Sequence, residues 1–160
     1  MALKVILREC TIDDLELLLA WRNLSSQGYY TQGKEKKLLT WDEHWAWWNK
    51  TQDWKRWIIQ VNDGFWTRDV GQVAFRDLYA WNPEIGIYIG EVTLWGQGVG
   101  RQALQLALGW LKEQRKHYCR TTIPKDNERA IRLFESCGFK RQGEAREGEW
   151  QYQIKVGKEN

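Results

Sequence analysis

The stretch Trp95-Gly96-Gln97-Gly98-Val99-Gly100-Arg101 lies between a predicted strand and a predicted helix, and it decides the fold. Glycines at this place let successive backbone N–H groups point into one concavity. The helix that follows adds its partial positive charge, and Arg101 adds a full charge in the first turn. The segment therefore predicts a site for a pyrophosphate, although the same glycines also fit a tight turn without a ligand.

Two common phosphate-binding fingerprints do not match this segment. A Rossmann loop needs G-x-G-x-x-G, but counting from Gly96 the third glycine position falls on Arg101. A P-loop needs Lys-Ser or Lys-Thr after its glycines, and neither follows here. A dinucleotide fold would also place the loop after its first strand, whereas this loop follows the fourth.

The hydrophobic pattern predicts one mixed α/β domain over residues 1–160, without a repeat, a low-complexity segment or a linker. Thr11 with Asp14, and Thr40 with Glu43, form capping boxes that begin the first two helices. The later helices are predicted at about 98–115 and 127–137. The strands are predicted at 2–9, 57–62, 70–78, 84–90, 118–123, 139–143 and 150–156.

A second motif follows the loop, and it reads Asn127-Glu128-Arg129-Ala130-Ile131-Arg132-Leu133-Phe134-Glu135-Ser136-Cys137-Gly138-Phe139. Together the two segments resemble the GNAT acetyltransferase superfamily, whose signature is [Q/R]-x-x-G-x-[G/A] and then N-x-x-A-x-x-L-[YF]-x-x-x-G-F. The resemblance implies a mixed α/β fold with a mostly antiparallel, twisted sheet of about six or seven strands. It also implies one splayed parallel pair of strands, about four helices on both faces, and acetyl-CoA as co-substrate with no metal.

The resemblance assigns the cofactor-binding residues. Backbone groups near Tyr88–Gly90 would hold the thioester, Asn127 the pantetheine arm, and Phe134 would pack near the sulfur. The predicted cofactor contacts are Ile89, Gly90, Trp95, Gly96, Gln97, Gly98, Val99, Gly100, Arg101, Asn127 and Phe134.

Two of these positions depart from the family pattern. Trp95 stands where many members have Arg or Gln. Phe134 stands where many have a tyrosine that is held to protonate the departing thiolate. Since phenylalanine has no proton to give, the enzyme would need another acid, a water molecule or no acid.

The predicted catalytic residues are Glu84, as a general base acting directly or through water, and Tyr88 on the same face of the strand. Two alternatives stay open. Glu84 could be a solvated carboxylate at a strand end, or positioning of the amine alone could suffice.

The acceptor is expected between the first two helices. These helices carry the segments W-R-N (21–23) and E-H-x-x-W (43–47), and they contain part of an unusually large total of 12 tryptophans. These segments resemble acetyltransferases that modify amino groups of nucleotide-linked sugars. The open alternatives are an aminoglycoside, a polyamine, a protein N-terminus, or a CoA-binding module without activity. A structural reading has Trp41, Trp45 and Trp48 packing one helical face on the sheet, and His44 as a structural or surface residue. The predicted substrate contacts are Arg22, Tyr30, Trp41, His44 and Trp48.

The composition of the chain disfavours several classes of binding partner. The chain has a net charge of +3 from scattered basic residues, which argues against nucleic acid. Its three cysteines lie far apart from one another, and its two histidines lie in different regions, so neither a disulfide framework nor a metal site is expected. No signal peptide or long apolar run is seen, which predicts a cytoplasmic protein without membrane contact. We expect a small-molecule amine as partner and a monomer or homodimer.

Overall fold

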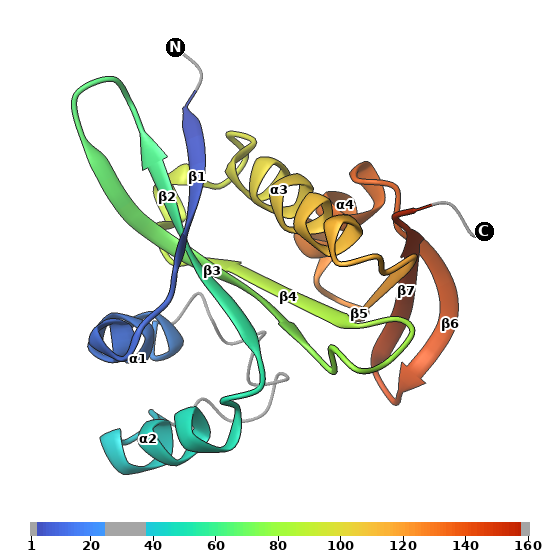
Figure 1. The fold of residues 1–160 in the computed structure, drawn as a ribbon, viewed down its shortest axis with the longest axis horizontal. Coiled ribbons are helices and arrows are strands. Elements are labelled where there is room, and N and C mark those ends of the chain that lie inside the picture. The colour runs from blue at the N-terminus through green and yellow to red at the C-terminus, as the bar shows by residue number, and fades with distance from the viewer. Residues whose placement is uncertain (1–2, 25–37, 158–160) are drawn as a thin grey trace.

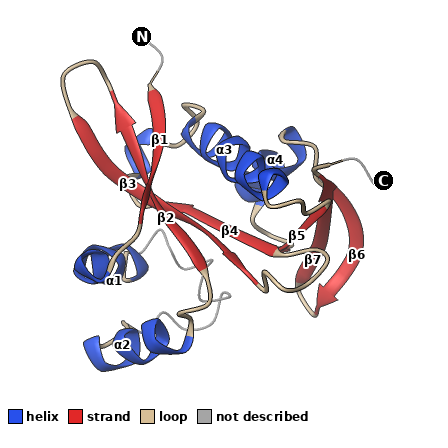
Figure 2. Cartoon of the chain, viewed as in Figure 1, coloured by secondary structure: helices blue, strands red, loops and turns tan. Residues whose placement is uncertain are grey.

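A computed structural model describes residues 3–24 and 38–157, which form one seven-stranded sheet flanked by four helices (Figure 1, Figure 2). The strand order is β1-β2-β3-β4-β5-β7-β6, and every neighbouring pair is antiparallel except β4 and β5. The strands are β1 (Lys4–Glu9), β2 (Lys55–Asn62), β3 (Thr67–Arg76), β4 (Glu84–Ile89), β5 (Tyr118–Pro124), β6 (Lys140–Arg146) and β7 (Glu149–Lys155). The helices are α1 (Leu15–Arg22), α2 (Trp41–Lys50), α3 (Val99–Glu113) and α4 (Glu128–Ser136), with single 3₁₀ turns η1 (Ile12–Asp14) and η3 (Val92–Leu94).

The helices lie on both faces of the sheet, with α3 and α4 on one side and α1 and α2 on the other (Figure 1). The larger core lies under α3, whose buried residues recur at helical spacing at Ala103, Leu104, Ala107, Leu108 and Leu111. A smaller cluster joins α1 and α2 to Ile58 of β2 through Leu15, Leu18, Trp21 and Trp48. These findings confirm the predicted fold class.

The parallel pair β4 and β5 is joined at one end only. Glu84 and Arg120 are its single paired position, and the Thr121 hydroxyl donates to the Ile85 carbonyl 2.8 Å away. Beyond this point the two strands separate toward their carboxyl ends. This confirms the predicted parallel pair and leaves the last part of β4 without β5 as a ladder partner.

The element boundaries differ from the sequence pattern in informative places. Both capping boxes are present, but the first helical segment begins as a 3₁₀ turn and becomes α-helical only at Leu15. Strand β2 begins at Lys55, earlier than expected, which places Arg56 inside the sheet. Within the described ranges, no helix is long and apolar enough to cross a membrane.

Candidate active site

The glycine-rich loop ends in an open helix start. Gly96 and Gly98 have φ values of 79° and 80°, in the left-handed region that favours glycine, and a Cβ added to either would meet no atom within 4 Å. Gly98 is the N-cap of α3, and no side chain caps this helix. Because the Gln102 N–H is the first to bond Gly98, the N–H groups of residues 99–101 have no acceptor within the helix. This helix start therefore fits a phosphate group.

The other residues of the loop serve its packing. Val99 is buried in the core, and the Gln97 side chain folds back to donate to the Thr93 carbonyl at 2.8 Å. A Cβ on Gly100 would lie 3.1 Å from Leu133 of α4. Thus the third glycine allows α3 and α4 to approach each other, and only the first two shape the open loop. Arg101 is exposed, as a phosphate contact requires.

Gly90, just after β4, is fixed by neighbouring elements. Its N–H donates to the Val70 carbonyl of β3 at 2.7 Å. A Cβ at this position would lie 2.3 Å from the Trp21 indole of α1. The predicted hold on the thioester by the Gly90 N–H is therefore corrected, because β3 already takes this donor. Glycine is needed here for the close approach of Trp21.

Trp95 connects the phosphate loop to both sides of the separated strands. Its indole N–H donates to the Ile89 carbonyl of β4 at 3.1 Å. The Arg129 guanidinium, from the first turn of α4, lies 3.6 Å from the centre of its ring. The residue that departs from the family pattern thus lies at the open end of the β4–β5 pair.

Asn127 and Phe134 have structural roles in this chain. The Asn127 side-chain oxygen accepts the Ala130 N–H at 3.2 Å and caps α4. Phe134 is buried and packs edge-on against Phe139, with ring centres 5.0 Å apart. Their predicted contacts with the pantetheine arm and the sulfur stay predictions.

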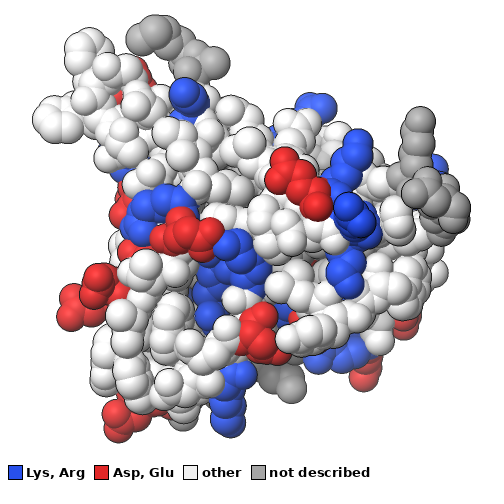
Figure 3. All heavy atoms as spheres, viewed as in Figure 1, with Lys and Arg blue, Asp and Glu red and all other residues white. Residues whose placement is uncertain are grey.

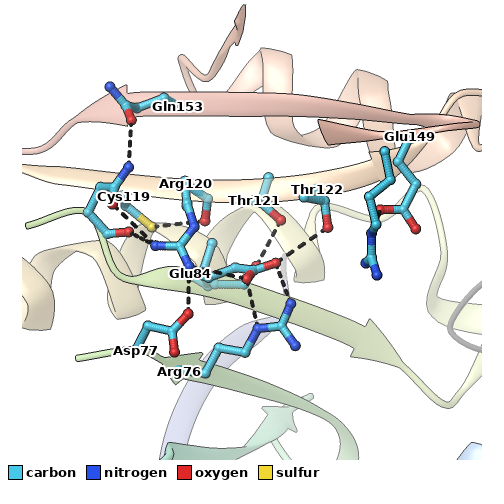
Figure 4. A network of polar contacts seen from close by, with 12 residues as sticks. Arg76, Asp77, Glu84, Cys119, Arg120, Thr121, Thr122, Glu149 and Gln153 are labelled. Atoms are coloured by element: carbon cyan, nitrogen blue, oxygen red, sulfur yellow. Dashed lines mark hydrogen bonds and ion pairs between the residues drawn. The ribbon is translucent and has the colours of Figure 1, made fainter. Parts of the chain in front are cut away.

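Glu84 lies in an ion-pair network at the closed end of β4 (Figure 4). Two guanidinium nitrogens of Arg76 each lie 2.7 Å from an oxygen of its carboxylate, and a nitrogen of Arg120 lies 3.6 Å from it. The Thr122 hydroxyl donates a hydrogen bond to the same carboxylate at 3.3 Å. The residue is only 8% exposed, so it is not a solvated strand-end carboxylate. Ile89 lies five positions farther along the chain, about 17 Å away in an extended strand. These contacts disfavour the predicted role of Glu84 as general base.

Tyr88, the second predicted catalytic residue, lies near the open end of β4. Its hydroxyl donates to the Gln72 side-chain oxygen at 3.1 Å, and its ring meets Trp21 edge-on with centres 6.0 Å apart. Gln72 is buried on the neighbouring strand β3 and was not predicted. A polar residue among apolar ones in the segment V-G-Q-V-A-F was the available signal.

Comparison with known proteins identifies the family. A family model described as an acetyltransferase (GNAT) domain matches residues 4–140. The chain belongs to the GNAT acetyltransferase family. This membership confirms the family that the two sequence motifs predicted.

Two relatives match nearly the whole of this chain. An uncharacterized protein of Methanocaldococcus jannaschii is 42% identical over 155 residues, which are 96% of this chain but only 31% of that protein's length. The crystal structure of a domain from the same organism has a TM-score of 0.89 at 41% identity and covers 96% of this chain and 99% of that one.

More distant structures share the fold. The spermidine N-acetyltransferase of Vibrio cholerae, solved with CoA and spermine, has a TM-score of 0.79 at 20% identity, with 95% of each chain covered. An aminoglycoside acetyltransferase solved with coenzyme A has a TM-score of 0.79 at 19% identity, again with 95% of each chain covered.

In this GNAT protein, α2 buries a different face from the one expected. Trp41 and Trp45 are 45% and 40% exposed, with rings stacked 6.5 Å apart. Trp48 is buried together with His44, one helical turn before it. The interpretation that three tryptophans pack one face on the sheet is therefore wrong, and Trp41 stays accessible to a ligand.

His44 is a structural residue. It is fully buried, and its Nε2–H donates to the Leu15 carbonyl of α1 at 2.8 Å. Its Nδ1 then accepts a hydrogen bond from the Arg22 guanidinium at 3.2 Å. Burial lowers the pKa of His44, which fits this neutral tautomer. The predicted direct contact with substrate is corrected, since the imidazole has no exposed surface. Tyr30, the remaining predicted substrate contact, lies outside the described residues.

Proposed function

We propose that this protein transfers the acetyl group of acetyl-CoA to a primary amine of a small molecule, by direct attack in a ternary complex. The observation that carries this proposal is the uncapped start of α3 beside a parallel strand pair that is joined at one end only. A nucleotide-linked amino sugar is the acceptor class we favour, because of the W-R-N and E-H-x-x-W segments and the exposed aromatic rings of α2.

The chain offers suitable groups along the whole cofactor. The N–H groups of residues 99–101 and the Arg101 side chain would hold the pyrophosphate. The pantetheine arm would lie where β4 and β5 separate, with the Asn127 amide as a donor. Acetyl-CoA supplies an activated acyl group as a thioester.

The chemical step needs few groups from the protein. The amine nitrogen attacks the thioester carbonyl carbon, the carbon–sulfur bond breaks, and the thiolate leaves with a proton from the amine or from water. We retain Tyr88 as the predicted residue beside the reacting groups, because it lies at the open end of β4 and Glu84 does not. Holding the amine close to the thioester then supplies much of the acceleration.

Other acceptors remain candidates for the test. Two structural neighbours are a spermidine N-acetyltransferase and an aminoglycoside acetyltransferase. A polyamine, an aminoglycoside and a peptide N-terminus therefore belong in the same panel. The cytoplasmic location and a monomeric or homodimeric state stay predictions.

Thiol release from acetyl-CoA, with each amine in turn, tests the function. We expect one class of amine to raise the release rate well above hydrolysis, and CoA to raise the melting temperature. If CoA stabilises the protein but no amine accelerates release, the reading as a CoA-binding module replaces this proposal. If CoA leaves the melting temperature unchanged, the cofactor assignment fails as well.

A further inference from the structure

Two arginines from different elements share one aromatic ring on the α1–α2 side of the sheet. The guanidinium of Arg22, the last residue of α1, lies 4.4 Å from the centre of the Trp47 ring. The guanidinium of Arg56, in β2, lies 4.8 Å from the same centre. Both guanidinium groups therefore pack against the same ring of α2.

Arg56 is buried without a full set of partners. It is 6% exposed, and its guanidinium also lies 4.6 Å from the Trp48 ring and 5.1 Å from the Trp54 ring. One terminal nitrogen donates to the Thr51 hydroxyl, but its buried Nε has no hydrogen-bond partner among the described residues. Loss of water around the group lowers the pKa of Arg56, and nearby Arg22 adds to this effect. A buried cation in such a setting needs an anion or further acceptors.

No described carboxylate neutralises this pair. Within the parts of the chain that the structure describes, neither arginine has a carboxylate oxygen within 4.0 Å, and Glu43 and Asp53 act on them only from farther away. Three nearby carboxylates are bound elsewhere, to Arg8 or Arg76: Asp14, Asp69 and Glu84. Figure 3 shows a group of basic side chains near the centre of this face of the molecule, with acidic side chains beside it.

We infer that Arg22 and Arg56 form a binding site for a phosphate group carried by the amine acceptor. Arg22 is half-buried, and the bond from its guanidinium to His44 Nδ1 leaves other N–H donors for the phosphate oxygens. The buried Arg56 supplies the second positive charge. The inference rests on the proposed acetyl transfer and assigns the phosphate of its acceptor to these two arginines.

The chemistry of the two arginines separates this acceptor from those of the structural neighbours. Guanidinium groups present paired donors that match phosphate oxygens, and they keep their charge at all physiological pH values. A polyamine carries several positive charges, which this pair would repel. A phosphate monoester and the diphosphate of a nucleotide sugar present the same oxygens, so both are needed as probes.

The experiment compares four amines with acetyl-CoA as donor: glucosamine, glucosamine 6-phosphate, UDP-glucosamine and spermidine. We expect at least one phosphate-bearing amine to exceed glucosamine in kcat/KM by about tenfold, the value of one charge-assisted hydrogen bond. Arg22→Gln and Arg56→Gln should each remove this preference. Arg56→Lys, which keeps the charge, should retain part of it.

Arg141→Gln is the matched control, because Arg141 is also stacked on a tryptophan, Trp150, at 4.3 Å, but lies in β6 at the far edge of the sheet. It should leave the preference unchanged. Equal use of glucosamine and its phosphate, a preference for spermidine, or an Arg56→Gln variant with an unaltered preference would overturn the inference.

A binding measurement keeps the inference separate from catalysis. With CoA present at saturation, so that the start of α3 is occupied, UDP-glucosamine or glucosamine 6-phosphate should raise the melting temperature of the wild type but not of Arg22→Gln. If this shift appears while no amine is acetylated, the phosphate site stands and the proposed function fails. If neither probe shifts the melting temperature and neither is acetylated faster than glucosamine, the phosphate site is refuted.

Discussion

The indole N–H of Trp95 donates to the backbone carbonyl of Ile89 across 3.1 Å and so ties the phosphate loop to the last residue of β4. The Arg129 guanidinium of α4 lies over the same ring, 3.6 Å from its centre. One side chain thus sets the distance between the loop, the end of β4 and the start of α4.

Trp95→Phe should weaken CoA binding while leaving the fold intact. Phenylalanine keeps an aromatic ring for Arg129 but has no donor for the Ile89 carbonyl. Loss of one such hydrogen bond costs about 1 kcal/mol, or about fivefold in affinity. Isothermal titration with CoA measures this change, and Trp66→Phe in the exposed β2–β3 turn is the control. Equal CoA affinities in both variants would count against the role of Trp95.

Gly90→Ala should destabilise the protein by about 1–3 kcal/mol, because the new Cβ would lie 2.3 Å from the Trp21 indole. Gly86→Ala in the preceding strand β4 is the control, since a Cβ there meets nothing within 4 Å. Urea unfolding followed by tryptophan fluorescence gives both free energies. The double variant with Trp21→Phe should be more stable than the two single losses predict, and simple additivity would contradict the steric explanation.

The two glycine-rich features show what the sequence could predict. Strand, loop and helix around Gly96 and Gly98 follow from local patterns, because turn residues and periodicity act over a few positions. The role of Gly100 depends on Leu133, and that of Gly90 depends on Trp21 and Val70. These contacts join elements that are distant in the sequence, so composition and spacing could not reveal them.

The acceptor side was harder to predict for a related reason. Tryptophans occur all around α2, so hydrophobic periodicity could not choose the buried face, and the contacts of His44 with α1 decide it. Arg56 was missed because the apolar run suggested a strand from Trp57 onward. The setting of Glu84 depends on Arg76 and Arg120 from the two neighbouring strands, which only the sheet topology brings together.

Gly98→Ala should weaken CoA binding by about fivefold or more. At φ 80° an alanine costs about 1 kcal/mol, and relief of that strain would move the first N–H groups of α3 away from the phosphate. Gly109→Ala is the control, because Gly109 lies within α3 and a Cβ there meets nothing within 4 Å. This second change should stabilise the protein by about 0.5–1 kcal/mol without altering CoA affinity. Titration with CoA and thermal unfolding of both variants check the pair, and an unchanged affinity in Gly98→Ala would contradict it.

His44 should make the protein less stable as the pH falls from about 6.5 to about 5. Burial lowers the pKa of the folded-state imidazole below its ordinary value of 6.5, so in this range the unfolded chain binds a proton that the folded chain does not. The free energy of unfolding then decreases with falling pH, by at most about 1.4 kcal/mol per pH unit. His44→Gln can still donate to the Leu15 carbonyl and accept from Arg22, but it does not titrate. Urea unfolding at several pH values should therefore show a smaller slope in this variant than in the wild type. Identical slopes in the wild type and His44→Gln would mean that His44 does not carry the pH dependence, since carboxylates that titrate below about pH 5 affect both proteins alike.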